Sequence, residues 1–164
     1  MRACTRHRIR RGFSLIESVV VIIVLAISVP PALQLLDSAA ATRADAINAT
    51  RATLLGTSVL EQILADVHSG DPALGFNALS DSAVYLNTAT TGLRDRITAL
   101  TDTYTALGLT YDVTIGPLAQ ADGTVSGDPG LDVYRRITVT VSYPSATDGA
   151  ISMPISAIVS EMGP

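Results

Sequence analysis

The residue with the clearest chemical interest is Glu17, a carboxylate inside an apolar stretch. Residues 13–36 read FSLIESVVVIIVLAISVPPALQLL and carry no other charged side chain. An ionisable group in such a stretch costs about 2.5–3.5 kcal/mol on membrane insertion, so it indicates a function and a cationic partner. If the chain were cut after Gly12, the new α-amino group of Phe13, with a reference pKa of about 7.7–8.0, would supply that cation.

Few other residues have types and spacing suited to chemistry. Asp122, Asp128 and Asp132 crowd one loop and are candidate calcium ligands, although their spacing does not fit an EF-hand. The alternative is that they are solvated turn residues, and we expect no other cofactor. His68 is the only histidine beyond His7, so a Ser-His-Asp triad would rest on composition alone. Cys4 is the only cysteine, which excludes an intrachain disulfide. We therefore do not expect this protein to be an enzyme.

Charge is distributed very unevenly along the 164 residues. All 11 basic residues are arginine, and five of them lie within residues 1–11. From Phe13 onward six Arg stand against 15 Asp and Glu, a formal charge of −9. An acidic body does not suit nucleic-acid binding, which needs a basic surface. With 48% hydrophobic and 16% charged residues, the chain resembles one domain of ordinary size with an apolar appendage.

The appendage is long enough to cross a membrane. As a helix, the 24 residues of 13–36 span roughly 36 Å, against about 30 Å for a hydrocarbon core. The arginines before it place the amino terminus in the cytoplasm by the positive-inside rule. The acidic remainder of the chain would then lie outside the cytoplasm.

The sequence RGFSLIE at residues 11–17, followed by VVVIIVLAI at 19–27, closely resembles the class III prepilin signal of type IV pilins and type II secretion pseudopilins. The resemblance implies that a prepilin peptidase cuts after Gly12 and that Phe13 becomes the N-methylated terminus. Glu17 would be the glutamate that aids entry of the subunit into the filament. The implied partners are the peptidase, other pilin or pseudopilin subunits and the bacterial inner membrane, where the subunit is single-pass before assembly.

Three other interpretations compete with the prepilin one. Arg10 and Arg11 also resemble a twin-arginine export signal, and residues 39–41 (AAA) or 44–46 (ADA) suit an ordinary signal peptidase. Under either of these two interpretations the apolar segment is removed, and a soluble secreted binding domain remains. The third is an uncleaved anchor. Glu17 counts against all three, because none of them uses a buried carboxylate.

Beyond the membrane span we expect a long amphipathic helix. Pro30 and Pro31 each remove a backbone donor, which predicts a kink or local melting there. The helix then resumes and ends near Gly70 and Asp71-Pro72. Apolar residues recur at mostly three- and four-residue spacing and predict the buried face: Leu36, Ala40, Ala44, Ile47, Leu54, Val59, Ile63 and Val67.

The remainder predicts a small antiparallel sheet. Apolar and polar residues alternate over 109–115, 136–143 and 151–159, with turn signals between them. One face would be covered by the amphipathic helix, and Pro154, which has no donor, would lie on an edge or bulged strand. Leu93, Ile97, Leu100, Tyr104 and Leu107 predict one face of a short helix.

The expected fold is α+β and pilin-like: a kinked N-terminal helix, its first half transmembrane, on a small antiparallel sheet. The expected parts are a leader (1–12), a transmembrane half-helix (13–36) and a periplasmic or extracellular head (37–164). The head contains a variable loop (69–108) and a β-meander (109–162). The stretch 54–64 together with the strand at 135–141 resembles minor pilins of the MSHA type.

Overall fold

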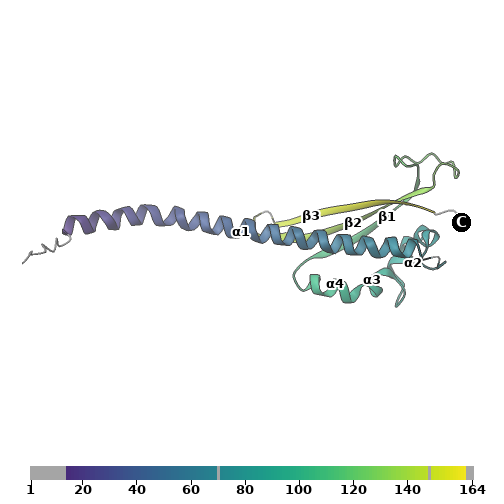
Figure 1. Ribbon diagram of the computed structural model, residues 1–164, viewed down its shortest axis with the longest axis horizontal. Helices are drawn as coiled ribbons and strands as arrows, with labels where there is room; N and C mark the ends of the chain where they lie inside the picture. Colours follow the sequence, from purple (N-terminus) through teal and green to yellow (C-terminus); the bar gives the residue numbers. More distant parts are fainter. Residues whose placement is uncertain (1–13, 70, 148, 162–164) are drawn as a thin grey trace, which may run out of the picture. The chain divides into compact units, whose positions relative to one another are not determined.

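The computed structural model describes residues 14–69, 71–147 and 149–161. The chain divides into two compact units, one ending at Ala41 and the other beginning at Thr42. Helix α1 (Leu15–Val67) contributes to both. The second unit also holds the 3-10 helix η1 (Phe76–Ser80) and helices α2 (Ser82–Asn87), α3 (Leu93–Arg96) and α4 (Thr98–Thr105). It is completed by strands β1 (Thr110–Ala119), β2 (Tyr134–Ser145) and β3 (Gly149–Ser160) (Figure 1).

Helix α1 continues through Pro30 and Pro31 without a break. The expectation of local melting is therefore wrong. The two adjacent prolines remove the hydrogen bonds to the carbonyls of Ala26 and Ile27 and crowd these carbonyls, but the helix is continuous on both sides. A bend at this point stays a prediction.

The sheet is an antiparallel meander with the order β1-β2-β3, as the period-two pattern predicts. Strand β2 is central, and its alternate residues Ile137, Val139 and Val141 are completely buried. Pro154 pairs with Thr140 on the edge strand β3, which confirms the edge position. Because proline cannot donate a ladder hydrogen bond, this pair must be a non-hydrogen-bonded one, with the proline nitrogen toward the free edge.

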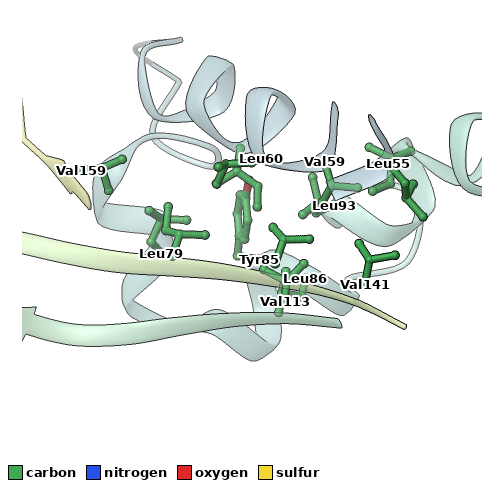
Figure 2. Packing of buried hydrophobic residues seen from close by; sticks show 14 of the residues in the cluster. Leu55, Val59, Leu60, Leu79, Tyr85, Leu86, Leu93, Val113, Val141 and Val159 are labelled. Atoms are coloured by element: carbon green, nitrogen blue, oxygen red, sulfur yellow. The ribbon is translucent and has the colours of Figure 1, made fainter. Parts of the chain in front are cut away.

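The core lies between α1 and the sheet. Figure 2 shows Leu55, Val59 and Leu60 of α1 facing Val113 and Val141 of the strands. Gly56 lets the helix approach closely, since a Cβ atom there would lie 2.6 Å from Ile155 Cδ1 and 3.2 Å from Val141 Cγ2. Figure 1 draws α2, α3 and α4 beside the second part of α1.

The predicted buried face of α1 is partly wrong. Leu36, Ile47 and Leu54 are exposed, at 67%, 48% and 55%. The buried residues of α1 are Ala52, Leu55, Gly56, Val59, Leu60, Ile63 and Asp66. Val59 and Ile63 were predicted correctly, but the contact face is rotated toward Leu55 and away from Leu54, because the sheet and not the local spacing decides which side is covered.

The single helix predicted from Leu93 to Leu107 is also wrong in part. It divides at Ile97, whose backbone leaves the α region at φ −99° and ψ 7°, into α3 and α4. Leu93 and Ile97 are buried as expected, whereas Leu100 and Leu107 are 37% and 45% exposed. Two short helices let the chain turn and bring Arg96 to α1.

Candidate functional site: the apolar segment of helix α1

The first part of α1, residues 15–36, is an apolar segment with its side chains exposed; we refer to it as the apolar segment. Fourteen large aliphatic side chains there are at least 45% exposed. The most apolar window of α1 has a mean hydropathy of 2.5, and none of it is buried. The helix is long and apolar enough to span a membrane. A segment of this kind is typical of a helix that lies in lipid or against other apolar helices.

The energies show that one carboxylate does not prevent membrane insertion. Removing each large aliphatic side chain from water gains about 1.5–3 kcal/mol, which gives a gross gain of roughly 20–40 kcal/mol for the segment. Placing a charged Glu17 in the membrane costs about 2.5–3.5 kcal/mol. The apolar gain is larger by roughly a factor of ten. Glu17 is therefore tolerated, and its cost falls if it meets a cation.

Glu17 lies in the first turn of α1, where a carboxylate interacts favourably with the helix dipole. The amide and the hydroxyl of Ser18 both donate to the carbonyl of Ser14, at 3.1 and 3.4 Å. The side chain of Glu17 is exposed and makes no hydrogen bond or ion pair within residues 14–69, 71–147 and 149–161. Gly12 and Phe13 lie outside the described residues.

The three loop aspartates bind their own backbone. Asp122 accepts the amide and hydroxyl of Thr124, and Asp128 accepts the amide of Gly130. Asp132, only 5% exposed, accepts the amides of Ser126 and Gly127 at 2.7–3.1 Å.

These amide hydrogen bonds hold the pKa of Asp132 below its usual range despite burial, which acts in the opposite direction. Across the described residues, no three His, Cys, Asp or Glu side chains are grouped to hold a metal ion. The three carboxylates therefore act here as organisers of the loop, and calcium binding stays a prediction.

Asp66 lies at the centre of a buried polar cluster that was not predicted from the sequence. Its carboxylate accepts both Nη atoms of Arg96, at 2.8 and 2.5 Å, and the hydroxyl of Tyr85 at 2.6 Å. Gln62 donates a fourth bond at 3.2 Å. Its spacing in the sequence could have indicated this burial, because Asp66 comes seven residues after Val59 and three after Ile63 and so lies on the buried face of the helix.

The hydrogen bonds and the burial of this cluster shift the pKa values of its members. Burial alone would raise the pKa of Asp66, but the hydrogen bonds from Arg96 and Tyr85 outweigh it and lower the pKa. Burial and the neighbouring carboxylate raise the pKa of Tyr85. The cluster joins α1 to α2 and α3 and has no free group, so its arrangement is that of a structural ion pair.

A second carboxylate of α1, Asp45, holds the turn between β2 and β3. It accepts the amide of Ala146 at 2.8 Å and the hydroxyls of Ser145 and Thr147 at 2.9 and 3.1 Å. The Ala146 amide is the main reason that the pKa of Asp45 is lowered. His68, the histidine considered above for a triad, contacts the carbonyl of Leu64 through Nδ1 at 2.5 Å.

No family model, no curated protein and no solved structure matches this chain.

Proposed function

We propose that the chain is a structural subunit of a type IV pilus or type II secretion pseudopilus, of the minor pilin kind. In this proposal a prepilin peptidase cuts after Gly12 and methylates Phe13. The subunit waits in the inner membrane on its apolar segment and then enters a filament built with other subunits. The observation that carries the proposal is Glu17: a carboxylate without a partner among the described residues, in a segment otherwise suited to lipid.

Assembly would exchange lipid contacts of the apolar segment for contacts with neighbouring helices. Both surroundings are apolar, so the aliphatic side chains alone give little preference for the filament. Glu17 supplies the preference, because in lipid it has no cation, whereas in the filament it meets the α-amino group of Phe13 from a neighbouring subunit. Charge pairs in apolar surroundings can fix register even where their net energy is small.

The mature amino terminus tests the processing step. Mass spectrometry of the protein from its host is expected to show N-methylated Phe13 as the first residue. Any other first residue contradicts the proposal.

The assembly step is tested by Glu17→Ala. This variant is expected to be processed normally and to lose filament incorporation several-fold, as measured by subunit content of sheared filaments. Glu61→Ala, an exposed carboxylate on the same helix, is the matched control and is expected to incorporate normally. Equal incorporation of the Glu17 variant and wild type would refute the pairing role.

A secreted binding domain is the second candidate, and one observation favours it. The division between the two units falls at Ala41 and Thr42, directly after the possible signal-peptidase site at residues 39–41. The second unit has a core of its own. A mature amino terminus near Thr42 would contradict the filament function and support a secreted domain.

A further inference from the structure

The outer face of the sheet, which α1 does not cover, contains a hollow of about 180 Å³. It forms where β1 shifts register between Ile115 and Leu118, at Gly116 and Pro117. Ala119 on β1, Tyr134 and Arg136 on β2, and Ile158 on β3 line it together with the turn at Gly123. A cavity needs about 10–15 Å³ of this volume to hold one water, so the hollow is far larger than a single-water site.

Arg136 supplies the charge in this hollow. In the strand register it lies opposite Ile158, on the outer face, whereas Ile137 is completely buried. The turn lies over its guanidinium, because a Cβ atom on Gly123 would stand 3.0 Å from Nη2, and Gly123 has φ +88°. Glycine at this position therefore leaves room for the guanidinium as well as permitting the turn.

The guanidinium of Arg136 has no acceptor within the described part of the chain. By contrast, Arg94 pairs with Asp112 and Arg96 pairs with Asp66. Its neighbour Arg135 faces the other way, lies 5.8 Å from the Phe76 ring and donates to the carbonyl of Gly116 at 3.1 Å. A carboxylate from outside would give Arg136 the partner that the chain does not.

The surroundings of Arg136 are apolar and accessible. Ile158 is 48% exposed, and the loop 120–133 beside the hollow exposes Val125, Leu131 and Val133 at 62%, 54% and 39%. This loop joins the ends of β1 and β2 that lie opposite the turn held by Asp45, as Figure 1 shows. The hollow is thus at the end of the second unit away from the residue where α1 enters it.

We propose that this hollow binds an acidic peptide segment of another protein. A large apolar side chain of that segment fills the space beside Ile158 and Tyr134, and an adjacent carboxylate pairs with Arg136. The net charge does not attract an acidic ligand, because the chain from Phe13 onward has a formal charge of −9 and repels anions at long range. A preference for an anion must therefore come from the local cation, Arg136, whose side chain is exposed beside the apolar residues that line the hollow.

Two matched peptides test the proposal on the full chain in dodecylmaltoside micelles. The probes are acetyl-(4-fluorophenylalanyl)-glutamic acid amide and its glutamine counterpart, titrated by ¹⁹F NMR against a micelle-only baseline. They differ only in the charge of one side chain. The glutamate peptide is expected to bind at least fivefold more tightly at 50 mM NaCl, and the ratio is expected to fall at 500 mM NaCl because the pair is solvent-accessible.

Three variants assign the effect to the hollow. Arg136→Gln is expected to reduce the ratio to about one, while Ile158→Ser weakens both peptides. Arg94→Gln, an exposed arginine elsewhere in the second unit, is the control and is expected to change neither. Tyrosine fluorescence of each variant in urea confirms that it is folded.

An equal affinity of the two peptides for wild type would overturn the proposal. A ratio that persists in Arg136→Gln, or no binding above the micelle baseline, would do the same. Because the peptides report on the hollow directly, these outcomes are distinct from success or failure of the filament proposal.

Discussion

Replacing Asp66 by Asn should destabilise the second unit strongly although the side chain keeps its size. Asp66 accepts four hydrogen bonds, two of them from Arg96, and its side chain is only 4% exposed. An amide has one acceptor oxygen and a donor NH₂ group, so at least one donor of Arg96, Tyr85 or Gln62 then faces another donor.

The expected cost is about 3 kcal/mol. Removing one partner of a buried ion pair costs about 3–5 kcal/mol, and the lower end applies because the Arg96 side chain keeps 22% exposure and some hydration. By comparison, Asp112→Asn breaks the exposed pair with Arg94, whose side chains are 68% and 43% exposed. That loss should be about 0–1 kcal/mol.

Urea unfolding of the full chain in micelles, followed by tyrosine fluorescence, measures both variants. The midpoint of Asp66→Asn should fall well below that of Asp112→Asn, and hydrogen exchange should accelerate first in α2 and α3, which the cluster joins to α1. If the two variants lose the same stability, the assignment of Asp66 as the main polar link between α1 and these helices is wrong.

Three more predictions follow from the packing and the turns. Gly56→Ala should lower the free energy of unfolding by about 1 kcal/mol, because overpacking at Ile155 outweighs the higher helix propensity of alanine. In an Ile155→Val background the same change should be neutral or stabilising, as measured by urea unfolding. Pro154→Val should increase self-association in light scattering, because it adds an N–H to the free edge of β3, whereas the control Ser156→Val should not. The pKa of Asp45 in the folded protein lies below its ordinary 3.8, so the hydrogen bond from the Ala146 amide to the carboxylate should be fully formed above pH 3.8 and lost as the pH falls through the lowered pKa. Hydrogen exchange at the Ala146 amide measures this loss. The variant Asp45→Asn should show fast exchange at this amide already at pH 7.

The strands could be predicted because their signal is local. In β2 every second side chain is buried and the sequence alternates accordingly, so no distant contact is needed to recognise the strand. Pro154 likewise reports its edge position through its own chemistry, the missing donor.

The buried face of α1 could not be predicted in the same way. Leu54 and Leu55 are adjacent and equally apolar, yet one is 55% exposed and the other 1%. Adjacent residues of a helix differ by about 100° in direction, and both directions fit an apolar stripe. The sheet covers the face that holds Gly56, whose missing side chain lets the helix approach Ile155 and Val141.

The structure of the segment between α1 and β1 is difficult to predict from the sequence for another reason. Its helices are short, and isolated helices of this length are unstable in water, so local propensity says little about them. Their position depends on contacts such as that between Arg96 and Asp66, which are 30 residues apart in the sequence. Only the unusual placement of Asp66 on an apolar face indicates that a partner exists.

Helix α1 has two parts whose surfaces differ in kind. From Ala52 onward it buries a stripe against the strands and keeps polar side chains such as Glu61 in water, whereas the apolar segment has no covered side. A helix that is apolar all round is stable only in lipid or against other apolar helices. Every role for the intact chain must therefore supply such surroundings for residues 15–36, and a role that does not must remove them by cleavage. The first residue of the mature protein distinguishes these two cases before any assay of function is needed.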